Sequence, residues 1–370
     1  MAHKELTEKL HDIIAPEAYK LHHLALLPLV AENTKQSFAV VHAAISSSGE
    51  DDFLNFILQQ GLGGLWHKVL KESVFSAFSS IFTNKLRSIA LLNAANYLQQ
   101  QYMLKNVEKI FKDHSIPYAV FKGAHIRELS YSQPAVRPAC DIDILVSETD
   151  KIRVICALTA HGLIFHPEAK NISHEASLSK NNVTIDLHWN LLRPGRTREN
   201  LTEEFLHTRQ EYSGQYGLCN EATLFIMLVH PVFAKYATAP QASLVRVVDL
   251  VRWVEKRNID WDKLQDWLIR GGVQTAAWIT AEWLAMLTGF TLPEPFLQKI
   301  KPGKFRSLYL QKWITCNYSS CLLNYPILIQ AGLTLPAHDR FSDACRAVSS
   351  LIREKRAAAE KMLRLQDECT

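Results

Sequence analysis

Two aspartates, Asp141 and Asp143, stand one residue apart in the segment DIDILV. If this segment forms a β-strand, both carboxylates project from one face and Ile142 and Ile144 from the other, because side chains alternate along a strand. Two carboxylates this close repel each other unless they are exposed to solvent or share a cation. Carboxylate oxygens are ligands that Mg²⁺ prefers. The pair therefore indicates a magnesium site, although an isolated Asp-x-Asp also fits a turn or a helix cap.

A third carboxylate, Asp186, stands in the alternating segment VTIDLHW. In a strand, Asp186 and His188 share one face while Ile185 and Leu187 share the other. Three strand carboxylates on one sheet can hold two divalent ions about 3.5 to 4 Å apart, which suits in-line attack at phosphorus. We therefore expect Asp141, Asp143 and Asp186 to be the catalytic and metal-binding residues, with two Mg²⁺ ions, or Mn²⁺ as the alternative.

The segment VFKGAH, upstream of these aspartates, indicates a phosphate-binding turn. Gly123 at a strand-to-helix junction lets backbone N–H groups approach a phosphate beside the positive end of the helix dipole. Lys122 adds a mobile cation there. Arg137 lies four residues before Asp141 and either contacts phosphate or fixes the loop by pairing with a carboxylate. The alternative for Gly123 is a turn that needs glycine only for its backbone angles.

The elements that position these residues fall into three parts. Residues 1–113 show helical periodicity, residues 114–200 contain four strand signals, and residues 201–370 return to helices. The strands are expected in IPYAVFKG and at 141–146, 162–166 and 183–189, with a short helix between the first two. We predict an α+β fold, in which a small mixed sheet with helices is flanked by N- and C-terminal helical regions.

The order of strand, Gly turn, helix, Asp-x-Asp strand, helix and third-Asp strand resembles the DNA polymerase β nucleotidyltransferase superfamily. More narrowly, FKGAHIRELSY, the R-x-x-x-D-I-D-I-L-V segment and IDLHW look like an uncharacterised bacterial nucleotidyltransferase family over about residues 116–189. The segments HP at 230–231 and RVVDL at 246–250 are compatible with that family.

This resemblance implies a polymerase β-like core that transfers a nucleoside monophosphate from an NTP to an acceptor and releases pyrophosphate. The acceptor would be a small molecule, a protein or an RNA end. Asp141 and Asp143 would bridge both metal ions, Asp186 would hold the catalytic ion, and Gly123 with its neighbours, Lys122 among them, would bind the nucleotide's β- and γ-phosphates. The superfamily's usual turn is Gly-Ser or Gly-Gly, whereas this chain has Lys-Gly-Ala. The missing Ser hydroxyl leaves an alternative open: an inactive nucleotide-binding or protein-interaction module on the same fold.

Three residues of the C-terminal region are secondary candidates. Arg246 and Asp249 stand three residues apart in a helical segment and are expected to pair on its surface. His230 lies in the preceding helical segment. The functional alternative is that these helices close over the nucleotide base or the acceptor.

Composition limits the setting of this chemistry. The 370 residues carry a formal charge of +4 without a basic run, so charge neither supports nor excludes a nucleic-acid partner. The sequence contains no stretch of about eighteen apolar residues, so no membrane-spanning helix is expected. The seven cysteines show no C-x-x-C pair, which favours reduced thiols. With no apolar signal segment at the N-terminus, these features predict a cytoplasmic protein.

Overall fold

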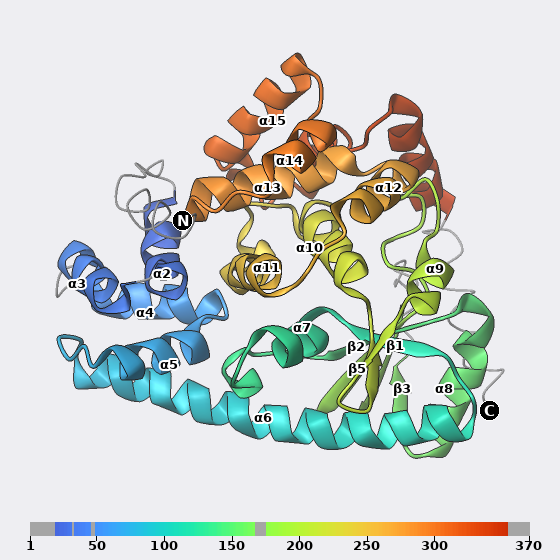
Figure 1. The fold of residues 1–370 in the computed structure, drawn as a ribbon, viewed down its shortest axis with the longest axis horizontal. Helices are drawn as coiled ribbons and strands as arrows, with labels where there is room; N and C mark the ends of the chain where they lie inside the picture. The colour runs from blue at the N-terminus through green and yellow to red at the C-terminus, as the bar shows by residue number, and fades with distance from the viewer. Residues whose placement is uncertain (1–18, 32, 46–48, 167–174, 354–370) are drawn as a thin grey trace.

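The computed structural model describes residues 19–31, 33–45, 49–166 and 175–353. A β-sheet lies between the long helix α6 (Ser80–Asp113) and the helices of the C-terminal half (Figure 1). Helices of the N-terminal part stand beside the sheet, above the first half of α6. The sheet is therefore enclosed by helices from both ends of the chain.

The sheet is mixed and has seven strands among the described residues, in the order β3-β4-β5-β2-β1-β7-β6. The central strands β2 and β5 are parallel, β1 is antiparallel to β2, and β1 is parallel to β7. The predicted α+β class is confirmed. The strands are β1 (Tyr118–Phe121), β2 (Ile142–Val146), β3 (Ile164–His166), β4 (Glu175–Lys180), β5 (Val183–His188), β6 (Gln210–Tyr212) and β7 (Gln215–Gly217).

Several strand predictions need correction. The strand expected at 141–146 begins at Ile142, so Asp141 immediately precedes it, and the strand expected at 162–166 covers only its last three residues. Strand β4 was not predicted. The expectation of helices alone beyond residue 201 is wrong for the β6–β7 hairpin, which extends the sheet through the pairing of Val120 with Gly217. Three-residue strands are too short to show a period of two.

The two faces of the sheet differ as the alternation predicted. Ile142 and Ile144 are buried in a core with Val120, Ile185 and Leu187. This core also contains apolar residues of the second half of α6 and of α8 (Lys151–Ala160). The opposite face carries Asp143 and His188, together with Phe121 and Leu145, which belong to the apolar core of the helices above the sheet.

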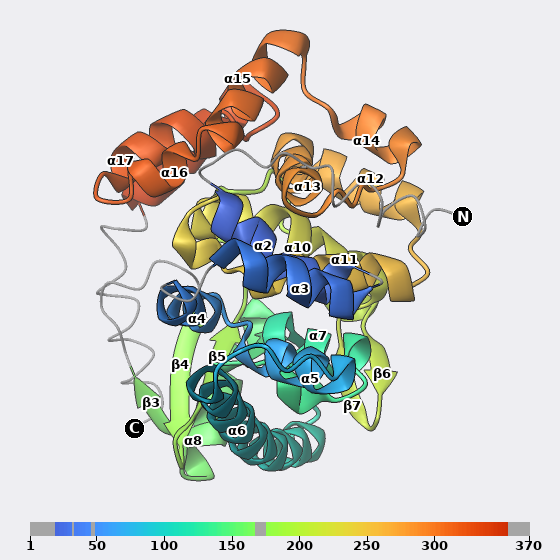
Figure 2. The same cartoon turned by 90° about the vertical axis from the view of Figure 1, so that its left-hand side faces the viewer.

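Every described element before β1 is helical. Helix α6 spans 34 residues, or about 50 Å at 1.5 Å per residue, so it reaches from the N-terminal helices to the sheet (Figure 1); Figure 2 looks along this helix. Its first turn is capped by the Ser79 hydroxyl, which accepts a hydrogen bond from the Phe82 amide. The other N-terminal helices are α2 (Lys20–Val30), α3 (Thr34–Ile45), α4 (Glu50–Gln59) and α5 (Gly63–Ser73).

The C-terminal helices form one apolar core with the N-terminal helices. Helix α10 packs against α12 and α13, while α11 and α13 both contact α2. The two helical regions therefore meet above the sheet rather than standing apart. The remaining helices are α7 (Lys122–Ser130), α9 (Thr202–His207), α10 (Asn220–Lys235), α11 (Leu244–Lys256), α12 (Trp261–Gly271), α13 (Gln274–Thr288), α14 (Glu294–Ile300), α15 (Lys304–Thr315), α16 (Tyr318–Cys321) and α17 (Pro326–Ile329).

None of the described helices is long and apolar enough to cross a membrane. The cysteines largely follow the expectation of reduced thiols. Cys156 is an exception because it is disulfide-bonded, and Cys369 lies outside the described residues. The free cysteines among the described residues are Cys140, Cys219, Cys316, Cys321 and Cys345.

A buried ion pair ties α11 to the loop before β2. Arg137 Nη2 donates to Asp249 Oδ2 at 2.6 Å, and the Tyr131 hydroxyl donates to Asp249 Oδ1 at 2.6 Å. The Asp249 side chain is only 1% exposed. The expectation that Asp249 pairs with Arg246 on the helix surface is wrong, because Asp249 faces inward and is taken by Arg137.

We predict that Asp249→Ala lowers the free energy of unfolding by about 3 to 5 kcal/mol, because it leaves the buried Arg137 guanidinium without its counter-charge. Urea unfolding followed by circular dichroism measures the loss. The matched control is Asp262→Ala, which removes a carboxylate that is 88% exposed and 3.1 Å from Lys299. That change should cost less than about 1 kcal/mol. Equal unfolding midpoints for the two variants would contradict a stabilising role for the buried pair.

Candidate active site

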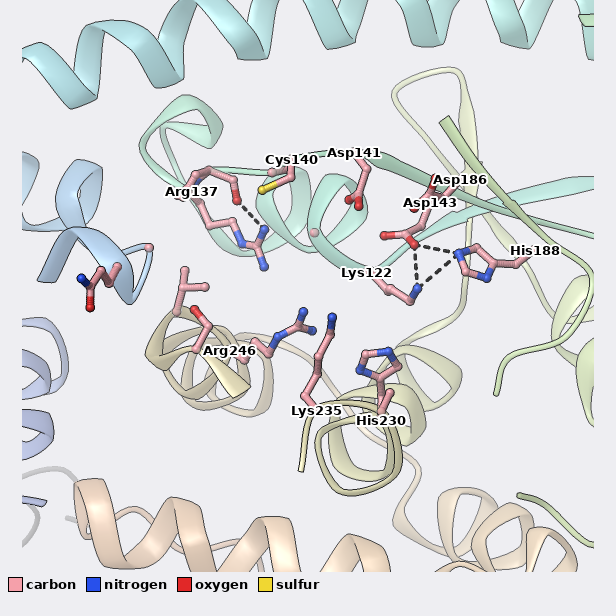
Figure 3. A pocket seen from close by; sticks show the side chains of 18 of the residues that line it. Lys122, Arg137, Cys140, Asp141, Asp143, Asp186, His188, His230, Lys235 and Arg246 are labelled. Carbon is pink, nitrogen blue, oxygen red and sulfur yellow. Dashed lines mark hydrogen bonds and ion pairs between the residues drawn. The ribbon is translucent and has the colours of Figure 1, made fainter. Parts of the chain in front are cut away.

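A cavity of about 770 Å³ opens on the polar face of the sheet, and residues of the N-terminal helices and of α10 and α11 complete its wall. The structure brings every site residue predicted from the sequence to this cavity. Figure 3 shows the side chains that project into it from the sheet and from the helices opposite. The predicted residues that line it are Lys122, Gly123, Arg137, Asp141, Asp143 and Asp186.

The parallel pairing of β2 with β5 sets the positions of the carboxylates. Asp143 lies directly beside Asp186 in this register, and Leu145 lies beside His188. Asp141 precedes β2 and reaches the same cavity. One register therefore gathers the three aspartates and His188 on one side of the cavity.

Asp143 is buried and held by two neighbours. Lys122 Nζ lies 2.6 Å from Asp143 Oδ1, and His188 Nε2 lies 2.9 Å from the same oxygen (Figure 3). Burial by itself raises the pKa of Asp143, but the Lys122 ammonium and His188 outweigh it and hold this pKa well below its ordinary value. Asp143 is therefore a carboxylate at neutral pH.

Asp141 has the opposite electrostatic environment. Burial, together with the negative charges of Asp143 and Asp186, raises the pKa of Asp141 from 3.8 to about 6. The ionised Asp141 side chain is thus in an unfavourable field without an added cation. A divalent ion at this place would relieve the repulsion.

The strand-to-helix turn differs from its expected geometry. Lys122, and not Gly123, adopts the left-handed conformation, with φ of 53°. Gly123 is required for space, since a Cβ there would lie 2.5 Å from Arg137 Nη1. Strained backbone of this kind costs about 1 to 3 kcal/mol and gathers at functional sites. The strained residue here is Lys122, whose ammonium contacts Asp143.

Arg137 lines the cavity, but its guanidinium is occupied. Its Nε and Nη2 donate to Asp249, and its Nη1 donates to the Pro138 carbonyl at 2.5 Å. Of its two expected roles, the structure holds Arg137 in the one that fixes the loop by pairing with a carboxylate. Phosphate contact by Arg137 stays a prediction.

A group of basic residues lies in the same cavity, and sequence reasoning named only two of them, as secondary candidates. Arg246, expected on a helix surface, lines the cavity instead, and so does His230. Lys235 and Arg196 were not considered at all, because single basic residues carry no local signal of which side of a helix bundle they face. His230 and Arg246 could be noticed because they lie in HP and RVVDL, the two segments that are compatible with the family.

The donor set fits a magnesium ion in kind. All three candidate ligands are carboxylates, and the raised pKa of Asp141 reflects a local excess of negative charge. As placed, however, no group of three or more His, Cys, Asp or Glu side chains in the described part of the chain is arranged to hold a metal. A cation that binds Asp143 Oδ1 has to displace Lys122 Nζ, which now contacts this atom.

A mixed sheet that brings three carboxylates to one cavity, beside a strand-to-helix turn, is the arrangement of a nucleotidyltransferase domain. The chain belongs to a family of uncharacterised nucleotidyltransferases, whose model matches residues 46–289. This confirms the family expected from the sequence. The match contains all the cavity-lining residues, which run from Leu58 to Arg246, so it extends beyond the sheet to the helices that complete the cavity wall. No curated protein matches the chain.

We predict that Asp141→Asn stabilises the metal-free protein at alkaline pH. The folded pKa of about 6 lies above the ordinary 3.8, so ionisation of Asp141 removes stability as the pH rises through this interval. In EDTA at about pH 8 the variant should exceed the wild type by about 1 to 3 kcal/mol, and this gain should shrink toward pH 4. Urea unfolding across this pH range measures it. Asp262→Asn is the exposed control, and a variant no more stable than the wild type at pH 8 would refute the repulsion.

Proposed function

We propose that this protein is a Mg²⁺-dependent nucleotidyltransferase that moves a nucleoside monophosphate from an NTP to an acceptor nucleophile. The observation that carries the proposal is the meeting of Asp141, Asp143 and Asp186 in one cavity of about 770 Å³. Cavities of about 300 to 1,000 Å³ suit ligands of nucleotide size. Membership of a nucleotidyltransferase family supports the same reaction class.

Asp141, Asp143 and Asp186 would hold two divalent ions, with Mg²⁺ preferred and Mn²⁺ as the alternative. Bound Mg²⁺ offsets the negative charge that develops on the phosphate oxygens and lowers the pKa of an acceptor hydroxyl. The Lys122 ammonium would turn from Asp143 to the phosphates of the nucleotide. His188 would keep Asp143 in place through its Nε2 contact.

In the reaction, the acceptor oxygen bonds to the α-phosphorus as the bond from this phosphorus to the α,β-bridging oxygen breaks, and pyrophosphate leaves. The acceptor proton is lost in the same step, and we assign the Asp186 carboxylate as the group that would accept it. The acceptor is a hydroxyl or similar nucleophile of a small molecule, a protein or an RNA end. The modest charge of +4 gives no added support to a long nucleic acid.

The test is thermal stabilisation by each of the four NTPs, with and without Mg²⁺. The wild type should show a Mg²⁺-dependent shift with at least one NTP, and the Asp141→Asn, Asp143→Asn double variant should lose it. The exposed variant Asp262→Asn should keep it. With the preferred nucleotide labelled at the α-phosphate, Asp186→Asn should lower transfer at least about a hundredfold, because metal stabilisation of the transition state is worth several kcal/mol.

The absence of a shift with any NTP, in a protein shown to be folded, would reject the proposal. It would favour the inactive module, for which the Lys122–Asp143 ion pair would be a permanent substitute for a metal. A shift that survives in the double variant would keep nucleotide binding and reject the aspartates as the metal ligands.

A further inference from the structure

Three basic side chains face the carboxylates from the other side of the cavity. Lys235 is the last residue of α10, Arg246 lies in the first turn of α11, and His230 lies on α10. All three line the cavity. Figure 3 shows Lys235 and Arg246 projecting from these helices toward Lys122 and Asp141. The cavity therefore has a carboxylate wall on the sheet and a basic wall on the helices.

The two longest cations of the basic wall, Lys235 and Arg246, are attracted by Asp141 and Asp143 across the cavity but are not in direct contact with them. Among the described residues, neither the Lys235 ammonium nor the Arg246 guanidinium makes a hydrogen bond or an ion pair. The nearest acid on the helix of Arg246 is Asp249, which is taken by Arg137 and Tyr131. By contrast, Lys122 and Arg137 in the same cavity each have a carboxylate partner.

Leaving these cations unpaired has a cost. Burial lowers the pKa of Lys235, and the charges of Arg246 and Lys122 lower it further. Burial also lowers the pKa of Arg246, with a further contribution from Arg137. A buried cation without a partner is unfavourable unless a ligand supplies the anion. The attraction of Asp141 and Asp143 offsets part of this cost, but the pKa of each cation stays below its ordinary value.

His230 is a second, independent sign of a ligand. Its side chain is more than nine-tenths buried, and its Nδ1 atom has no hydrogen-bond partner. Buried polar atoms are almost always hydrogen-bonded, so an orphan at a cavity wall marks a position for an unseen polar group. Burial holds the pKa of His230 well below its ordinary value, and the nearby cations lower it further. The ring is therefore neutral and can donate or accept a hydrogen bond.

We propose that Lys235 and Arg246, assisted by His230, bind the β- and γ-phosphates of the nucleoside triphosphate. This inference rests on the proposed function and assigns the polyphosphate end of the substrate to the helical wall. The Lys-Gly-Ala turn has no Ser hydroxyl to bind phosphate, and the charged side chains from α10 and α11 would make the phosphate contacts in its place. The pyrophosphate would then leave along the basic wall, while the α-phosphate lies toward the aspartates.

The first experiment uses inorganic tripolyphosphate in EDTA, without nucleotide or metal, and measures binding by calorimetry. The wild type should bind, while Lys235→Gln and Arg246→Gln should each weaken binding at least about tenfold, since each variant loses a charge-assisted hydrogen bond to the anion. The matched controls are Lys105→Gln and Arg87→Gln on the exposed side of α6, which should bind as the wild type does. Arg246→Lys should recover part of the loss.

Thermal unfolding without any anion separates a binding role from a structural one. If Lys235 and Arg246 serve to bind an anion, the unfolding temperatures of Lys235→Gln and Arg246→Gln should equal or exceed that of the wild type, because each variant removes an unpaired buried charge. Lower unfolding temperatures for both, or tripolyphosphate binding that neither variant weakens, would overturn the inference. A wild type that binds no tripolyphosphate would overturn it as well, and binding equal to that of inorganic phosphate would indicate an adventitious ion only.

Nucleotide transfer distinguishes this inference from the proposed function. If the wild type transfers nucleotide and Arg246→Gln leaves the KM for the NTP unchanged, the basic wall is wrong and the function stands. If tripolyphosphate binds through Lys235 and Arg246 but no NTP stabilises the protein with Mg²⁺, the anion site stands and the nucleotidyltransferase function fails. An increase of about tenfold in KM with a smaller change in kcat supports both.

Discussion

Repulsion between three carboxylates in one half-buried cavity is the interaction on which the rest of this structure depends. The parallel register of β2 and β5 forces Asp143 beside Asp186, and Asp141 enters the same space. Such a group is stable only if cations offset it. Lys122 does so for Asp143, from a strained backbone position. The next residue, Gly123, has no Cβ that would collide with the Arg137 guanidinium. The compensation is uneven, because Asp141 keeps a raised pKa while that of Asp143 is depressed. The site is therefore electrostatically polarised before any ligand arrives.

The helical regions form part of the wall of this site. Helices α10 and α11 form the far wall of the cavity, and the buried pair of Arg137 with Asp249 fastens α11 to the loop that leads into β2. The N-terminal helix α2 contacts α11 and α13, so both ends of the chain share one apolar core around the cavity. The family match, residues 46–289, likewise extends beyond the sheet in both directions and includes α10 and α11.

The sequence predicted those parts of the site that local periodicity encodes. Alternation in DIDILV and VTIDLHW is a signal over a few residues, and it correctly separated the aspartates from Ile142 and Ile144. The hairpin β6–β7 left no such signal, because its strands hold three residues each and β7 pairs with β1 from far along the chain. The spacing of Arg246 and Asp249 placed them near each other on a helix, but only packing against the core decides that one faces Arg137 and the other the cavity.

For the same reason the sequence did not show that Lys235 and Arg246 face the cavity together, opposite the Lys-Gly-Ala turn. A Gly-Ser turn binds phosphate with neutral groups, so it needs no counter-ion when the site is empty. Lys122 is charged, and in the metal-free protein it contacts Asp143 instead. Under the proposed function, a metal ion at Asp143 and a phosphate near Lys122 would enter together, because each replaces the partner that the other loses. Lys235 and Arg246, which have no such partner to leave, would then be the groups that an incoming triphosphate meets with their charge uncommitted.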